Sequence, residues 1–226
     1  MRKAVAFVLV FVLGAGFYAV LVNIPFGADK AEVAKHYMRN ASLETGAANI
    51  VTSVVVAYRG FDTLGEVTIL FIAAVAVGTV LYSGGRPASE GKPDASLIVR
   101  TGSKVLFPFI LLLGAYIFLH GHLTPGGGFQ GGAVIASGFL LLYLAWPRGP
   151  SGKKAFRAVE SLSGLAFVAV GILGIVFGVG FLGNFMPLGA RNALLSAGVI
   201  PIIYAAIGLK VGAELAGVVA HLMERE

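Results

Sequence analysis

Long apolar runs separated by short polar stretches make up most of the chain. Each run is a candidate for a membrane-spanning helix, which needs about 20 mostly apolar residues to cross a hydrocarbon core of about 30 Å. Six runs are of this kind: Ala4 to Val22, Val67 to Tyr82, Val105 to Leu119, Phe129 to Trp146, Leu162 to Leu182, and Ala193 to Val211, the last extending toward Met223. The pattern predicts an all-α, polytopic transmembrane protein.

A shorter apolar run, Ala47 to Tyr58, is ambiguous. At about 1.5 Å per residue, a helix of this length is short for a full crossing. The run is therefore a short crossing, a half-helix or a re-entrant piece. The first long run follows Arg2 and Lys3 and is longer than an ordinary signal-peptide core, which favours a retained helix over a cleaved signal.

Basic residues between the runs indicate which helix ends face the cytoplasm, because cytoplasmic loops carry an excess of Lys and Arg. Two clusters precede the third and fifth long runs: Arg86, Lys92, Arg100 and Lys104, then Arg148, Lys153, Lys154 and Arg157. If these loops and the N-terminus are cytoplasmic, 120–128 and 183–191 lie outside, and an even number of crossings precedes Gly84. We therefore expect six full crossings plus one short or re-entrant segment. The alternative is seven crossings with the N-terminus outside.

Composition supports a membrane location. Hydrophobic residues make up 57% of the 226 residues and charged residues only 12%, whereas about a quarter of a soluble domain is charged. The net charge of +6 is explained by the loops, and no nucleic-acid recognition motif accompanies it. The chain has no cysteine, which excludes thiolate metal sites and cysteine-ligated iron–sulfur clusters. We expect a protein of the lipid bilayer that binds no nucleic acid.

The chain divides into two predicted modules. A stretch rich in Gly, Pro and Ser, SGGRPASEGKPDAS at 83–96, has the composition of a linker. It separates a membrane module at 1–82 from a second one at 97–226. No internal repeat relates the two, so the inverted halves typical of a self-contained secondary transporter are missing. This organisation favours a protein that works with other subunits.

Three ionisable residues lie in YRGFDTLGE, between two apolar stretches: Arg59, Asp62 and Glu66. One interpretation is a carboxylate that takes up and releases H⁺ or Na⁺, with Arg59 tuning its affinity. The other is an interfacial loop with solvated charges and Asp62 as the N-cap of the next helix. Capping is favoured for Asp62. An ion pathway is favoured for Glu66, which lies one turn further into the apolar run.

A second motif, HGHLTPGGGFQGG, lies between two apolar runs. His120 and His122 are two residues apart and point to different sides of a helix, and no acidic or cysteine ligand stands nearby, so a metal site is not indicated. Pro125 is expected to end the helix, and Gly126, Gly127 and Gly128 to allow a tight turn or close approach of another helix. The favoured interpretation is a helical hairpin. The alternative is a proton relay through the histidines.

In the last apolar run, Lys210 and Glu214 are four residues apart, which suits an intrahelical ion pair. Paired charges within a membrane helix either neutralise each other or belong to an ion pathway. The pair is therefore a secondary candidate for ion translocation. Glu160 follows a basic loop and is expected at the membrane interface, and His221 is expected in solvent.

Both motifs resemble a known family. HGHLTPGGGFQGG is similar to the signature of the B subunit (MnhB-like domain) of multisubunit Mrp-type Na⁺/H⁺ antiporters. VVVAYRGFDTLGEVTIL is similar to a segment near the C-terminal end of the large A subunit of the same antiporters. The resemblance implies an A-tail-like module at 1–82 joined to a B-like domain at 97–226. Related modules occur in membrane arms of archaeal energy-converting hydrogenases and sulfur-reducing complexes, relatives of respiratory complex I.

The resemblance also implies a function. The chain is expected to be a transport subunit, not an enzyme, in a prokaryotic cell membrane. Its expected partners are other Mrp-type subunits, either in a stand-alone antiporter or beside a hydrogenase or sulfur reductase arm. The transported ions are Na⁺ and H⁺, and no cofactor is expected to be bound.

The resemblance assigns roles to individual residues as well. It makes Glu66 an ion-pathway carboxylate, and His120, His122 and Pro125 positions that matter for antiport or assembly. Gly126 to Gly128 are implied to serve packing and turns. The large antiporter domain that normally precedes the A-tail is absent, so other subunits must hold the main proton path. The alternative is a structural subunit that couples its neighbours without binding ions.

Overall fold

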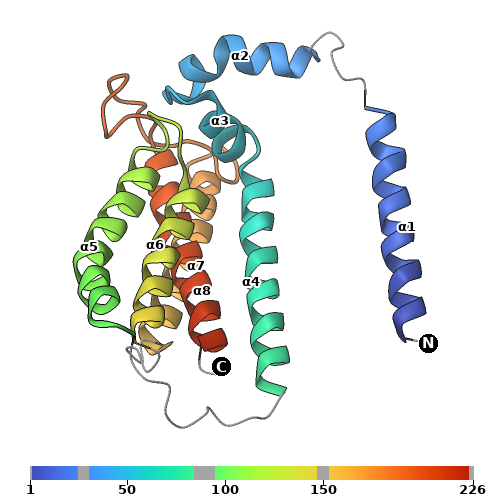
Figure 1. Cartoon of the computed structure of the whole chain (residues 1–226). Helices are drawn as coiled ribbons and strands as arrows, with labels where there is room; N and C mark the ends of the chain where they lie inside the picture. The colour runs from blue at the N-terminus through green and yellow to red at the C-terminus, as the bar shows by residue number, and fades with distance from the viewer. Residues whose placement is uncertain (1, 25–30, 84–94, 147–152, 224–226) are drawn as a thin grey trace. The chain divides into compact units, whose positions relative to one another are not determined.

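The computed structural model describes residues 2–24, 31–83, 95–146 and 153–223, and every regular element in these ranges is helical (Figure 1). The chain forms two compact units, Met1–His36 and Tyr37–Glu226. The first contains α1 (Arg2–Val22) and the start of α2 (Glu32–Thr45). The second contains all the other helices. The prediction of an all-α protein is confirmed.

Six described helices are long and apolar enough to cross a membrane, as the sequence predicted. They are α1, α4 (Gly60–Ser83), α5 (Leu97–Leu119), α6 (Gly128–Ala145), α7 (Lys153–Val176) and α8 (Ile200–Met223). Side chains along α1, α4 and α5 remain largely exposed, which is typical of helices whose apolar surface faces lipid.

The ambiguous run is indeed short. It forms one turn of α3 (Ile50–Thr52) followed by the π-helix η1 (Ser53–Tyr58). The C-cap of the π-helix is Arg59, whose backbone N–H donates to the Val54 carbonyl at 2.8 Å. Helix α4 begins at the next residue, Gly60. The prediction of one short element beside six long helices is confirmed. Such π-turns are rare and are often found at functional sites.

Helix α8 is the centre of the second unit. It packs against α4, α5, α6 and α7, and it is the most buried of the candidate spans (Figure 1). Ile200, Ile203 and Ile207 lie almost fully buried along it, and Val67 of α4 and Phe167 of α7 join the same core. Because α4 packs on α8, the two predicted modules share one hydrophobic core. The predicted linker lies mostly outside the described residues, as do Arg86, Lys92 and Arg148 of the basic loops.

Between α7 and α8, the apolar runs extend beyond the helices that they predicted. Helix α7 ends at Val176 and not at Leu182, and α8 begins at Ile200 and not at Ala193. Positive φ angles at Gly178 (77°) and Gly180 (112°) stop α7, because glycine readily adopts this left-handed conformation. The connecting segment 177–199 keeps an apolar sequence because part of it is buried. Leu182, for example, is only 4% exposed.

Candidate functional site

The loop that carries HGHLTPGGG is held by one side chain from the short element. The Asn49 amide nitrogen donates to the carbonyls of Gly121 (2.9 Å) and Thr124 (3.0 Å), and its backbone N–H donates to the carbonyl of His122 (3.0 Å). The Asn49 side-chain oxygen accepts from the Val51 N–H at 3.0 Å and so caps α3. Two segments far apart in sequence are thereby fixed to each other.

A buried hydrogen-bond chain extends this connection to α8. The Thr52 hydroxyl donates to the Gly121 carbonyl at 2.6 Å, and the Tyr204 hydroxyl donates to Thr52 at 3.0 Å. A Cβ atom on Gly121 would lie 2.6 Å from the Tyr204 ring, so only glycine fits there. The two motifs recognised in the sequence therefore belong to neighbouring parts of one folded unit.

The two histidines occupy different environments. The His120 ring stacks on Tyr116, with centroids 4.2 Å apart, and its Nδ1 lies 3.2 Å from the Tyr116 carbonyl. His122 is fully buried, with Nε2 3.4 Å from the Ala193 carbonyl and with no partner for Nδ1 among the described residues. Burial lowers the pKa of His122 below its usual value, so its ring is neutral near pH 7. A proton relay through these histidines stays a prediction.

The expectation that Pro125 ends the helix was wrong, since α5 ends at Leu119. Pro125 lies within the loop, and the glycines after it are sites of close approach. A Cβ on Gly126 would lie 2.9 Å from the Ile117 carbonyl, and one on Gly128 would lie 2.5 Å from Ile207. The triplet, with Gly127 in its middle, thus brings the loop and the start of α6 against α5 and α8.

Arg59 and Asp62 form an ion pair, with Nε and Oδ2 2.5 Å apart, and both side chains are at least half exposed. Asp62 lies inside the first turn of α4, which begins at Gly60, so the expectation that it is the N-cap was wrong. Its negative charge still suits the positive end of the helix dipole. The ion pair at this junction therefore contains Arg59 and Asp62 and not Glu66.

Glu66 lies one turn further along α4 and is exposed, and no ion pair or hydrogen bond involves it within the described part of the chain. It lines a cavity of about 180 Å³ together with Thr63, Gly126, Gly127, Gly128 and Tyr204, among others. The structure therefore places the favoured carboxylate beside the glycine triplet of the second motif, although the two are about sixty residues apart in sequence.

A second cluster of charges surrounds Lys210. Its Nζ lies 3.3 Å from a Glu214 carboxylate oxygen, 3.9 Å from a Glu160 carboxylate oxygen and 5.0 Å from the centre of the Phe71 ring. Glu214 is only 3% exposed, and its Oε1 has no hydrogen-bond partner among the described residues. The predicted pair is therefore part of a triad that includes Glu160.

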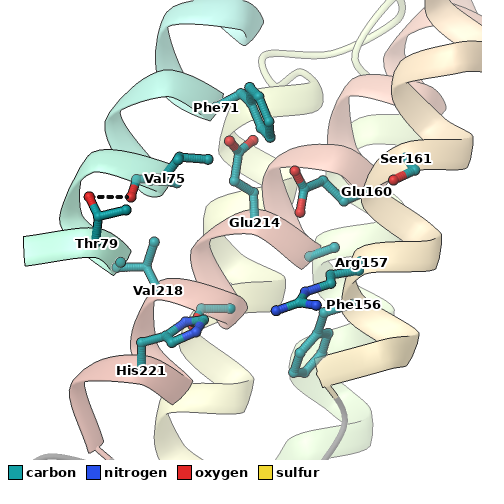
Figure 2. Close-up of a pocket in the computed structure, with 14 residues that line it drawn as sticks. Phe71, Val75, Thr79, Phe156, Arg157, Glu160, Ser161, Glu214, Val218 and His221 are labelled. Atoms are coloured by element: carbon teal, nitrogen blue, oxygen red, sulfur yellow. Dashed lines mark hydrogen bonds between the residues drawn. The ribbon is translucent and has the colours of Figure 1, made fainter. Parts of the chain in front are cut away.

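Two members of the triad, Glu160 and Glu214, line a larger cavity, of about 620 Å³, between α4, α7 and α8 (Figure 2). Polar side chains on its walls are those of Thr79, Arg157, Glu160, Ser161, Glu214 and His221. Glu160 and His221 were not assigned to any site from the sequence. The sequence does contain a signal for them, because residues a whole number of turns apart lie on the same face of a helix. His221 follows Lys210 by eleven residues, about three turns, and Glu160 follows Arg157 by three residues, about one turn.

These features define a class of protein: a polytopic membrane protein with buried charges on its spanning helices, which is typical of transport proteins. Comparison with known sequences identifies the family. The chain belongs to the family of domains related to the MnhB subunit of Na⁺/H⁺ antiporters, which matches residues 98–217. Residues 1–95 match a second family, MbhE, the E subunit of MBH. The resemblance seen in the two sequence motifs is confirmed.

Individual relatives agree with this assignment. An uncharacterized protein of Methanocaldococcus jannaschii is 30% identical over 91% of this chain and 86% of its own length. A probable A/B subunit of a K(+)/H(+) antiporter of Rhizobium meliloti is 29% identical over 58% of this chain, which spans only 16% of that relative.

Two solved structures share the fold. A chain of the membrane-bound sulfane sulfur reductase, an archaeal respiratory membrane complex, is 44% identical with a TM-score of 0.80, over 100% of this chain and 99% of that one. A chain of the Mrp complex from Dietzia sp. DQ12-45-1b is 28% identical with a TM-score of 0.72, over 98% of this chain and 26% of that one. The fold therefore occurs both as a separate chain and as part of a longer one.

Proposed function

We propose that this chain is a membrane subunit of a multisubunit monovalent cation (Na⁺)/proton antiporter module in a prokaryotic plasma membrane. It works with other Mrp-type subunits, either in a stand-alone antiporter or in the membrane arm of a respiratory hydrogenase or sulfur reductase complex. It holds no redox centre of its own. The likeness to chains of an Mrp complex and of a sulfur reductase complex supports this proposal.

The position of Glu66 is the observation that carries a role in translocation. A carboxylate on a membrane-spanning helix is costly unless it meets a partner, water or an ion. Glu66 is exposed on α4 and lines a cavity with the glycine triplet. We propose that it exchanges a proton for Na⁺ where this chain faces a neighbouring subunit, with His120 and His122 near the outer mouth.

The alternative is a structural subunit that packs and couples its neighbours without binding ions. The motif glycines support it, because they permit backbone-to-backbone approach: a Cβ on Gly131 would lie 2.6 Å from the Gly114 carbonyl. Under this alternative the charge of Glu66 is dispensable for transport.

Measuring Na⁺-dependent proton transport by the intact complex in proteoliposomes distinguishes a translocation role of Glu66 from the structural alternative. For Glu66→Gln we expect the transport rate to fall about tenfold or more, the change that about 1.4 kcal/mol in a barrier produces. The matched control is Glu32→Gln, which neutralises an exposed carboxylate paired with Lys35 on α2. Assembly is verified by native electrophoresis. If Glu66→Gln assembles and transports like the control, the structural alternative takes the lead.

A further inference from the structure

The cavity between α4, α7 and α8 has an unused acceptor on its wall. Glu214 is almost fully buried and lines the cavity, yet one of its two carboxylate oxygens has no hydrogen-bond partner among the described residues. A buried ionised oxygen without a donor is costly. Figure 2 shows the carboxylates of Glu214 and Glu160 turned toward the space between the three helices. This space therefore offers two acidic groups to a cation.

The charges around the cavity favour one further positive charge. Glu160 and Glu214 share the single ammonium of Lys210, which leaves this triad with a net charge of minus one. Of the other charged or titratable groups on the walls, Arg157 of α7 is exposed and is screened by solvent, and His221 lies near the end of α8. The residues of α4 that line the cavity are uncharged.

We propose that this cavity binds one hydrated alkali cation, held by the carboxylates of Glu160 and Glu214 in competition with a proton. Carboxylate oxygens suit hard monovalent cations. A volume of about 620 Å³ accommodates the cation with several waters.

Lys210 acts as a tethered competitor at this site. Its ammonium is close to both carboxylates, so it occupies the position that a cation would take. The Phe71 ring, 5.0 Å away, stabilises the ammonium by a cation–π contact when the cation displaces it from the carboxylates. Phe71 lies on α4, and the charged residues lie on α7 and α8. Occupancy of the site therefore affects how α4 packs against the other two helices.

Na⁺ binding to the purified intact complex tests the proposal. It is measured with ²²Na⁺ at equilibrium, on wild type and variants that assemble normally. We expect Glu214→Gln to remove one saturable Na⁺ site per copy of this chain, and Glu160→Gln to weaken Na⁺ binding at the same site about tenfold or more.

Lys210→Gln removes the competing ammonium and is expected to tighten Na⁺ binding. Glu32→Gln, on the exposed surface of α2, serves as the control. Lowering the pH is expected to weaken Na⁺ binding in the wild type, because protons compete for the carboxylates.

A second measurement does not depend on removing a charge. The chain has no cysteine, so Ser161→Cys places a single thiol of this chain on the cavity wall. We expect Na⁺ to slow modification of this thiol by a small cationic reagent several-fold relative to choline at equal ionic strength. Equal rates in the two salts, or unchanged Na⁺ stoichiometry in Glu214→Gln, would overturn the proposal.

This inference rests on the proposed function for its role in exchange, but the two fail differently. Loss of transport in Glu66→Gln with full Na⁺ binding in Glu214→Gln leaves the function standing and removes the site. Loss of one bound Na⁺ in Glu214→Gln with normal transport in Glu66→Gln leaves the site standing and removes the assigned role of Glu66.

Discussion

At the scale of single residues, His122 illustrates how burial decides chemistry. It is 0% exposed, its Nδ1 has no partner among the described residues, and its backbone carbonyl is held by Asn49. Burial disfavours the charged ring and lowers its pKa. His122 therefore stabilises the loop as a neutral residue, and protonating it opposes the fold.

The stability of the folded protein depends on pH through His122. Below about pH 6.5 the unfolded chain binds a proton at His122 that the folded chain does not, so stability falls with pH until the lowered folded pKa is reached. The limit for one proton is about 1.4 kcal/mol per pH unit. We expect the unfolding temperature of wild type to fall between pH 7.5 and 5.5, and His122→Gln to flatten this dependence. Fluorescence-detected melting of the detergent-purified complex measures this pH dependence of the unfolding temperature.

His120→Gln controls for loss of any loop histidine. A parallel pH dependence in wild type and His122→Gln would contradict the prediction.

At the scale of elements, the contact between α6 and α8 depends on glycine. A Cβ on Gly132 would lie 2.8 Å from the Gly208 carbonyl oxygen and 2.9 Å from the Gly212 backbone nitrogen. Backbone atoms cannot move aside without separating the helices. Close backbone approach is a common way to pack membrane helices, where burial of apolar surface from water contributes little.

Gly132→Ala is therefore expected to destabilise the protein by about 1–3 kcal/mol, a typical cost of overpacking. Gly102→Ala is the matched control, because a Cβ there meets nothing within 4 Å and alanine favours a helix by about 0.5–1 kcal/mol. The apparent unfolding temperature in detergent should fall for the first variant and be unchanged or higher for the second. Equal shifts in both would show that the close contact of α6 and α8 is relieved at little cost.

Apolar sequence predicts where the long helices lie but not where each one ends. The long apolar runs located all six long helices, because lipid-facing and core-facing surfaces are both apolar. The runs misplaced the end of α7 and the start of α8, because Leu182, Ala197 and Val199 in the connecting segment are buried like helical residues. Local turn chemistry, the positive φ of Gly178 and Gly180, decides that boundary.

At the scale of the whole molecule, contacts between helices far apart in sequence determine which residues each candidate site contains. Spacing four residues apart predicted the Lys210–Glu214 pair. The addition of Glu160, and the meeting of Glu66 with the glycine triplet, depend on how α4, α7 and α6 pack around α8. The spacing of residues within one helix does not show how that helix packs against the others. For this reason only part of each site was predicted from the sequence.

Basic residues are concentrated at the starts of two helices of the second unit. Arg100 and Lys104 lie near the start of α5, and Lys154 and Arg157 near the start of α7. The opposite ends of these helices lead into the motif loop and into 177–199, which meet where His122 Nε2 lies 3.4 Å from the Ala193 carbonyl. An excess of Lys and Arg marks cytoplasmic ends, so the motif loop is expected outside.

Labelling of introduced cysteines with a membrane-impermeant maleimide tests this orientation, because the chain has no cysteine of its own. Leu195→Cys, at a position 87% exposed, is expected to react in right-side-out vesicles, and Lys154→Cys only in inside-out vesicles. Ser196→Cys, at a fully buried position, is the unreactive control.

Asn23→Cys distinguishes six crossings from seven. It reacts on the same side as Leu195→Cys if six helices cross with the N-terminus in the cytoplasm, and on the opposite side if the short run also crosses. Reaction on the opposite side would require the segment 47–58 to span the bilayer, although its helices are too short to do so unaided.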